Sequence, residues 1–187
     1  IREKGVNGDR EMAYALHLAG FDVKDVHMTD LTSGRETLDD INMIVFCGGF
    51  SNSDVLGSAK GWAGGFLWNE TAQSTLRRFY ERTDTISLGI CNGCQLMIEL
   101  GLITPGADPR PHMDHNTSHK FESQFLGLDI PANESVMLKH LSGMKLGVWV
   151  AHGEGKFCLP DETKGYNVVA RYNYDAYPAN PNGSQGA

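Results

Sequence analysis

The turn at residues 89–93 constrains the fold of this chain more than any other stretch. It reads Gly-Ile-Cys-Asn-Gly, follows the strand-like residues 85–88 and precedes residues 94–100, whose apolar spacing is typical of a helix. A strand that turns sharply into a helix, with small residues two positions either side of a nucleophile, forms a nucleophile elbow. The sequence therefore predicts an elbow with Cys91 as a thiol nucleophile.

This position suits a thiol chemically. The N–H groups and the positive dipole end of the helix favour thiolate over thiol. The same N–H groups can receive the negative oxygen that forms when a carbonyl is attacked. We therefore interpret Cys91 as an acyl-transfer nucleophile for an amide or ester. A buried cysteine that only packs is the alternative.

A second candidate stretch is Gly-Gly-Phe-Ser at residues 48–51, after the buried-strand pattern of residues 41–47. Glycines at the carboxyl end of a strand let the backbone approach a ligand, and open α/β sheets bind ligands at such ends. If this strand lies beside that of Cys91, the N–H groups of Gly49 and Asn92 are candidates for an oxyanion hole. A plain turn is the alternative.

Histidines supply two further candidates. His152 and Glu154 have the spacing at which a carboxylate can orient an imidazole, which would make them a base and its partner for Cys91. The polar stretch 112–119 holds three histidines and an aspartate that could bind a metal, but a solvated loop is the preferred interpretation and we predict no metal site. Asn116-Thr117-Ser118 also matches a glycosylation acceptor, which a cytoplasmic chain never uses.

Strand and helix patterns alternate along the first half. Asp9 is expected to cap a helix over residues 10–19, and strands over 21–28 and 41–47 precede a helix over 68–82. This order predicts an α/β fold with an open, mostly parallel sheet flanked by helices. In the second half we expect antiparallel or mixed strands at the sheet's margin, at residues 121–130, 135–141, 146–150 and 166–172.

Composition excludes several classes of protein. A chain of 187 residues with a net charge of −7 and no Lys/Arg cluster is one domain by default and offers no nucleic-acid surface. No apolar run approaches the roughly 20 residues that cross a bilayer. Four cysteines are too few and too unevenly spaced for a disulfide framework, so the chain is expected to be cytoplasmic. Residues 1–5 and 177–187 look like cut elements, so we expect a fragment truncated at both ends.

With these pieces assembled, the chain resembles the class I, or triad, glutamine amidotransferases, which are flavodoxin-like. More narrowly, it is similar to the glutaminase domain of the phosphoribosylformylglycinamidine synthase family. The resemblance covers nearly the whole chain, and its second and fifth stretches are specific to that family. The stretches are residues 2–7, 47–51, 89–95, 152–155 and 177–184.

The resemblance implies a role for each stretch. Cys91 would attack the side-chain amide of glutamine, release ammonia and leave a thioester for water to hydrolyse, with Gly49 and Asn92 supplying the oxyanion N–H groups. A synthetase domain would use the ammonia with ATP and Mg, so no cofactor is expected in the glutaminase domain itself. The residues that would bind glutamine are Phe50, Ser51, Gln95, His152, Gly153 and Glu154.

The resemblance also argues against His152 as the base. In the family the base and its partner lie in a His-Pro-Glu-Arg type motif that would follow Ala187, the last residue of the sequence. Loss of a positioned base typically costs about 10²–10⁴-fold in rate, so residues 1–187 alone are expected to be nearly inactive. Two other functions remain open: a redox protein that uses Cys91 and Cys94, and a non-catalytic glutaminase-like scaffold.

Overall fold

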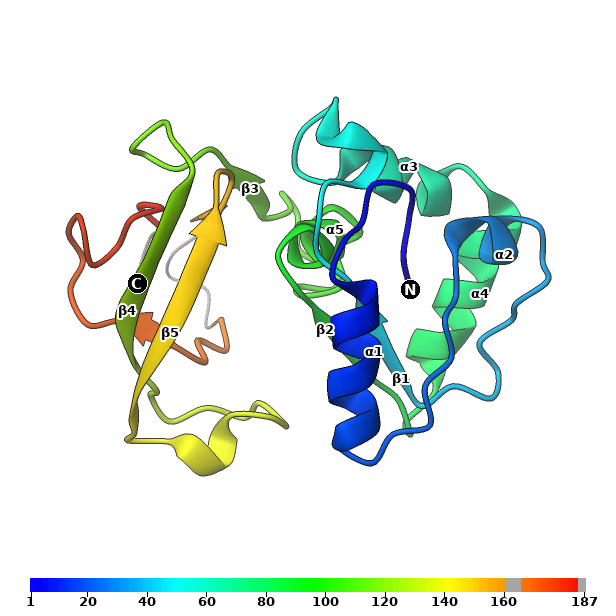
Figure 1. The fold of residues 1–187 in the computed structure, drawn as a ribbon, viewed down its shortest axis with the longest axis horizontal. Helices are drawn as coiled ribbons and strands as arrows, with labels where there is room; N and C mark the ends of the chain where they lie inside the picture. Colours follow the sequence, from blue (N-terminus) through cyan, green and yellow to red (C-terminus); the bar gives the residue numbers. More distant parts are fainter. Residues whose placement is uncertain (161–165, 185–187) are drawn as a thin grey trace. The chain divides into compact units, whose positions relative to one another are not determined.

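The computed structural model of the chain describes residues 1–160 and 166–184. These residues form two compact units, Ile1–Pro105 and Gly106–Ala187, which are described separately (Figure 1). The prediction that the whole chain is one glutaminase domain stays a prediction. No helix within the described ranges is both long enough and apolar enough to span a membrane.

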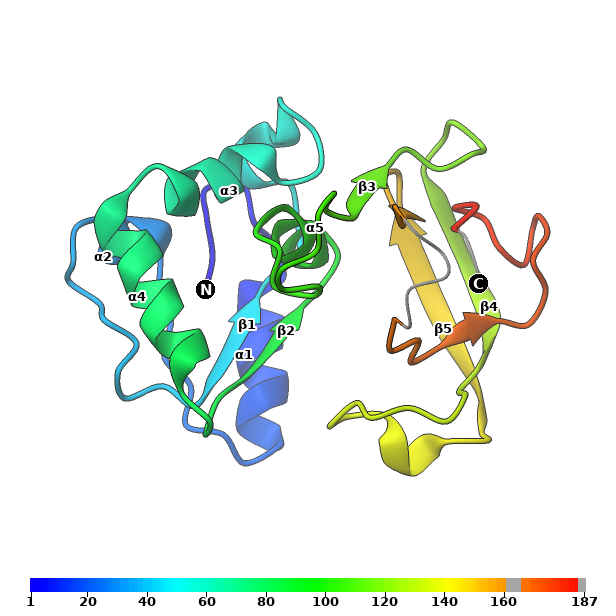
Figure 2. The same cartoon turned by 180° about the vertical axis from the view of Figure 1, so that it is seen from behind.

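The first unit is built on two parallel strands, β1 (Met43–Phe46) and β2 (Ile86–Gly89) (Figure 2). Arg2 and His27 form an isolated parallel bridge, and the Ile1 carbonyl accepts a hydrogen bond of 3.3 Å from the Cys47 N–H. Helices precede, separate and follow the two strands, which confirms the α/β class. The helices are α1 (Asp9–Leu18), α2 (Met28–Thr32), α3 (Lys60–Leu67), α4 (Glu70–Glu81) and α5 (Asn92–Glu99), with a 3₁₀ turn η1 (Ser51–Asp54).

Aromatic side chains from β1 and α3 form the centre of this unit's core. The ring of Phe46 meets those of Trp62 and Phe66 edge to face, with centroids 6.0 and 6.2 Å apart. The α4 helix begins at an Asn69 cap, whose side chain accepts a hydrogen bond from the Ala72 N–H at 2.9 Å. The core therefore packs β1 against the helices. This packing also fixes the end of β1 that lies beside Cys91.

The second unit is mainly antiparallel. Strand β4 (Glu122–Asp129) lies between β5 (Lys145–His152) and β7 (Arg171–Tyr172), and β3 (His112–Asp114) pairs with β6 (Lys156–Cys158). The expected strands at 121–130 and 146–150 are confirmed. Among the described residues they form a sheet of their own, so the prediction that they extend the parallel sheet is wrong.

Several predicted elements are wrong in detail. Residues 135–141 form no strand but a turn ending in the 3₁₀ segment η2 (Lys139–Leu141), because the Ser135 hydroxyl accepts the Leu138 N–H at 3.3 Å. Helix α1 begins at Asp9, and its cap is Gly8 in a left-handed conformation. Within residues 21–28 only His27 pairs with another strand, and within 166–172 only Arg171 and Tyr172 do. Helix α3 is not predicted from the sequence, because the glycines within residues 60–67 do not indicate a helix.

Candidate active site

Cys91 occupies the predicted elbow. Strand β2 ends at Gly89 and helix α5 begins at Asn92, and Cys91 between them has φ 52° and ψ −109°. This conformation is unfavourable for a residue with a Cβ atom, and such strain is concentrated at functional sites. The Cys91 carbonyl accepts the N–H groups of Cys94 and Gln95 at 2.9 and 3.1 Å, which starts the helix. The side chain is exposed, so the alternative of a buried packing cysteine is wrong.

The two glycines of the elbow are required by close packing. A Cβ atom at Gly93 would overlap the backbone carbonyl of Phe46 and would lie only 2.8 Å from the Phe46 Cβ. A Cβ atom at Gly89 would lie 2.6 Å from the Gly93 carbonyl oxygen. Glycine at both positions therefore lets α5 pack directly against the ends of β1 and β2.

The glycine pair after β1 lies beside Cys91, as the sequence predicts. The Ile90 N–H donates to the Phe46 carbonyl at 3.1 Å, and a Cβ atom on Gly48 would lie 3.2 Å from that of Cys91. Gly49 has φ 131°, and a Cβ atom there would lie 2.8 Å from the Cα of Val6. Residues 5–7 therefore hold this corner from its other side, a role that the sequence did not reveal.

Asn92 connects the corner to the helix. Its side chain is buried, its Oδ1 accepts the Ser51 N–H at 3.1 Å, and its Nδ2 donates to Gln95 Oε1 at 2.8 Å. The Ser51 hydroxyl is buried and has no hydrogen-bond partner among the described residues, whereas Phe50 is exposed. The structure thus brings together, within one unit, Cys91, Gly49, Asn92, Phe50, Ser51 and Gln95.

The two N–H groups predicted to form an oxyanion hole belong to the residue after Gly48 and to the first residue of α5. Within the described residues, neither the Gly49 N–H nor the Asn92 N–H donates to a backbone carbonyl. The bridge between Gly49 and Val6 is formed by the residues next to them. The Asn7 N–H donates to the Gly48 carbonyl, and the Phe50 N–H donates to the Gly5 carbonyl. An acyl-transfer site needs such donors beside a nucleophile, so the oxyanion hole stays a prediction.

Cys94 lacks the properties of a resolving thiol. Burial, and to a lesser extent the neighbouring Cys91, raise the pKa of Cys94 to about 11. Thiol–disulfide exchange needs a thiolate, and roughly one part in a thousand of such a thiol is ionised at pH 8. The environment of Cys94 therefore disfavours the redox function.

We expect a small alkylating reagent at pH 8 to modify Cys91 at least about tenfold faster than Cys94, because only Cys91 is exposed and the Cys94 thiol stays protonated. Peptide mass spectrometry over time measures both rates, with a Cys94→Ser variant to confirm the assignment. Rapid formation of a Cys91–Cys94 disulfide under mild oxidation would support the redox alternative instead.

His152, Gly153 and Glu154 lie in the second unit, at the end of β5 and in the turn after it. His152 Nδ1 is 3.0 Å from Asn116 Oδ1, and burial lowers the pKa of His152. Glu154 Oε1 lies 3.4 Å from His115 Nδ1. In the parts of the chain that the structure describes, no cluster of three or more His, Cys, Asp or Glu side chains could hold a metal ion.

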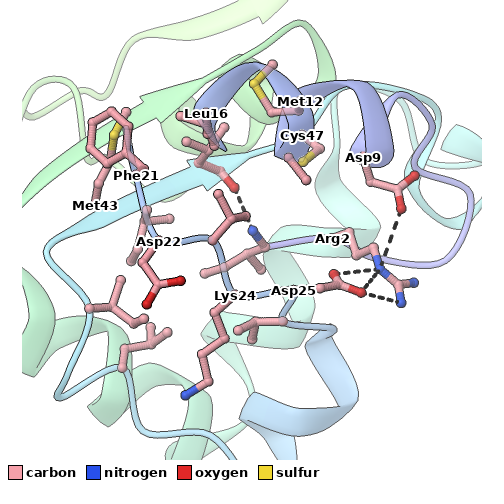
Figure 3. Close-up of a pocket in the computed structure, with 18 of the residues that line it drawn as sticks. Arg2, Asp9, Met12, Leu16, Phe21, Asp22, Lys24, Asp25, Met43 and Cys47 are labelled. Carbon is pink, nitrogen blue, oxygen red and sulfur yellow. Dashed lines mark hydrogen bonds and ion pairs between the residues drawn. The ribbon is translucent and has the colours of Figure 1, made fainter. Parts of the chain in front are cut away.

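A cavity of about 740 Å³ lies elsewhere in the first unit (Figure 3). Its lining comes from α1, β1 and residues 21–26, and Figure 3 shows the ion pair between Arg2 and Asp25, which measures 2.9 Å. Neither Cys91 nor the five residues grouped with it line this cavity. This cavity is therefore separate from the candidate active site.

The fold and the elbow agree with the comparisons with known proteins. The model of the CobB/CobQ-like glutamine amidotransferase domain matches residues 1–187, so the chain belongs to this family. Among curated proteins, it is 47% identical over 203 aligned positions to a protein of Arabidopsis thaliana named probable phosphoribosylformylglycinamidine synthase, chloroplastic/mitochondrial. It is 43% identical over 201 positions to the phosphoribosylformylglycinamidine synthase of Dictyostelium discoideum.

The alignments cover 98% and 99% of this chain but only 14% and 15% of those two relatives. Among solved structures, PurLQS from Thermotoga maritima matches with a TM-score of 0.76 and 29% identity. That match covers 98% of this chain and 74% of the other. The likeness thus extends over both units of the chain.

Proposed function

We propose that this chain is the glutaminase part of a phosphoribosylformylglycinamidine synthase. In this proposal it hydrolyses glutamine to glutamate and ammonia, and a synthetase domain uses the ammonia with ATP to convert formylglycinamide ribonucleotide into the amidine. The observation that carries the proposal is the exposed Cys91 on a strained elbow, beside the Gly48–Gly49 corner. The names of the two curated relatives support the choice of synthase.

The proposed reaction has two stages. The Cys91 thiolate attacks the side-chain amide carbon of glutamine, and the carbonyl electron pair moves to the oxygen, which the Gly49 and Asn92 N–H groups stabilise. The C–N bond then breaks, the nitrogen takes a proton and leaves as ammonia, and a glutamyl thioester remains. Water attacks the thioester to release glutamate and restore the thiol. The family resemblance assigns proton transfer to the histidine of a His-Pro-Glu-Arg type motif.

The resemblance assigns glutamine binding to two groups of residues. The hydrogen bond from Asn92 fixes the amide of Gln95 near the nucleophile, and Phe50 is exposed next to the glycine corner. Ser51 contributes through its backbone, because its hydroxyl is buried. The other group that the resemblance assigns is the turn of His152, Gly153 and Glu154.

The remaining assignments follow from the same proposal. The fold is of the flavodoxin-like kind found in class I amidotransferases, and the glutaminase reaction needs no cofactor, since ATP and Mg belong to the synthetase domain. The partner is that synthetase domain. The cytoplasmic location stays a prediction, and the Arabidopsis relative is named as chloroplastic/mitochondrial.

The proposal is tested by following the amide nitrogen. The full-length protein is given ¹⁵N-amide glutamine, formylglycinamide ribonucleotide, ATP and Mg, and we expect ¹⁵N in the amidine product with one glutamate formed per transfer. A parallel reaction with ammonium salt measures the synthetase alone. Amidine formation from ammonium without any glutamate release from glutamine would favour the non-catalytic scaffold.

Asn92 gives a quantitative prediction. Asn92→Ala removes the side chain that holds both the Ser51 backbone and Gln95, so kcat/KM for glutamine is expected to fall about 10²-fold. Asn42→Ala is the matched control, since this asparagine is exposed and its side-chain amide donates to Asp84, away from the Cys91 elbow. A folded Asn92→Ala protein with wild-type kcat/KM would exclude this role.

A further inference from the structure

We propose that Asn116 is a positioning residue that holds the His152–Gly155 turn and fixes the proton of the His152 ring on Nδ1. The proposal rests on the proposed function in one respect, namely that this turn binds glutamine. Its structural part stands on contacts within the second unit alone. Asn116 was interpreted from the sequence only as part of an unused glycosylation acceptor.

Asn116 contacts the turn through both ends of its side-chain amide and through its backbone N–H. Its side chain is fully buried, and its Nδ2 donates to the carbonyls of His152 at 2.7 Å and Lys120 at 3.0 Å. Its Oδ1 accepts the Gly155 N–H at 3.2 Å, and its backbone N–H donates to the Gly153 carbonyl at 2.9 Å. Because both hydrogens of the Asn116 amide donate to carbonyls, the positions of its nitrogen and its oxygen are determined.

This orientation determines the tautomer of His152. The Asn116 Oδ1 lies 3.0 Å from His152 Nδ1, and an amide oxygen can only accept, so Nδ1 must carry the proton. Burial lowers the pKa of His152, which keeps the ring neutral near pH 7 and leaves Nε2 without a proton. Nε2 is buried and has no hydrogen-bond partner among the described residues.

The ring's charged neighbours lie on β4 and just before it. Glu122 is directly opposite His152 in the antiparallel register, and Lys120 lies 3.8 Å from the Glu122 carboxylate. The Glu122 charge acts to raise the pKa of His152, but its effect is smaller than that of burial. The neutral ring therefore contacts the Asn116 amide and has a buried glutamate as its partner residue on the neighbouring strand.

The other side of the turn is held as well. The Gly155 carbonyl accepts Asn182 Nδ2 at 2.6 Å and the Ser184 hydroxyl at 3.4 Å. A Cβ atom at Gly155 would lie 2.7 Å from Cγ of His152, so the imidazole packs directly on this glycine. The backbone on either side of Glu154 is thus held by asparagine side chains from two other segments, and Asn116 Oδ1 is the side-chain atom that contacts a ring nitrogen in the described ranges.

The test uses ¹⁵N-histidine NMR of the chain at pH 7. We expect the His152 signals of the wild type to show a protonated Nδ1 and an unprotonated Nε2. Asn116→Ala removes the acceptor, so the ring should change to the usual Nε2-protonated form. Asn116→Asp has the same shape but adds a carboxylate, so both nitrogens should carry protons at pH 7. Asn133→Ala is the control, because Asn133 bonds within residues 131–135.

A wild-type ring protonated on Nε2 would overturn the proposal without any variant. An unchanged tautomer in a folded Asn116→Ala protein would overturn it as well. In the full-length protein, Asn116→Ala should raise the KM for glutamine about tenfold, with a smaller change in kcat and no change with ammonium. The expected NMR change with an unaltered KM would leave the positioning contact intact and remove the turn from glutamine binding.

Discussion

Replacement of Cys91 by alanine is expected to lower glutamine hydrolysis by at least about 10³-fold, because no thioester can form without the thiol. The side chain is exposed, and alanine keeps a Cβ atom in the same backbone conformation, so the fold should change little. Glutamate release by the full-length protein measures the effect. Amidine formation from ammonium should stay at the wild-type rate, since it bypasses the glutaminase reaction.

Cys94→Ser is the matched control for this substitution. Cys94 lies three residues further along the chain, in the first turn of α5, and its thiol stays protonated because burial raises its pKa to about 11. We expect this variant to keep at least roughly a third of the wild-type rate, since serine differs from cysteine by one atom. Loss of glutaminase activity in Cys94→Ser with retention in Cys91→Ala would contradict the assignment of the nucleophile.

Substitution of Gly93 by alanine is expected to destabilise the protein by about 3 kcal/mol, because the added methyl group would overlap the backbone carbonyl of Phe46. Neither backbone segment can move away easily, since β1 belongs to the core and Gly93 lies in the first turn of α5. For a chain of this length the melting temperature should fall by roughly 10 °C. Calorimetry or circular dichroism measures the shift.

Gly61→Ala gives the contrasting result. Gly61 also lies in a helix, α3, but the nearest atom to its added methyl group would be Asn52 Cβ at 3.4 Å. Alanine is favoured over glycine within helices by up to about 1 kcal/mol, so this variant should be as stable as the wild type or more stable. Equal melting temperatures for Gly93→Ala and the wild type would mean that α5 does not pack on β1 as closely as described.

The nucleophile elbow could be predicted because its causes are local. The glycines of residues 89–93, the strand before them and the helix after them all follow from residues adjacent in sequence. The proximity of Gly48–Gly49 to Cys91 followed from one further assumption, that the two strands are parallel neighbours. The register of Phe46 with Gly89 confirms it.

The predictions from the sequence are wrong where contacts join residues distant in sequence, or where a side chain overrides the local secondary-structure pattern. Residues 135–141 have β-like composition, but the Ser135 hydroxyl captures backbone N–H groups and forms a turn. The position of Asn116 could not be predicted, because its partners at 152–155 lie 36 or more residues away. The polar stretch 112–119 was expected to be a solvated loop, yet His112–Asp114 pairs with Lys156–Cys158 as a short strand.

The most direct test of the central claim is to treat the full-length protein with 6-diazo-5-oxo-norleucine, a reactive mimic of glutamine, and to locate the adduct by mass spectrometry. The account predicts one adduct, on Cys91, whose formation is slowed by glutamine, and none on Cys47, Cys94 or Cys158. A Cys91 that stays unmodified by the mimic while a small thiol reagent still alkylates it would contradict the account.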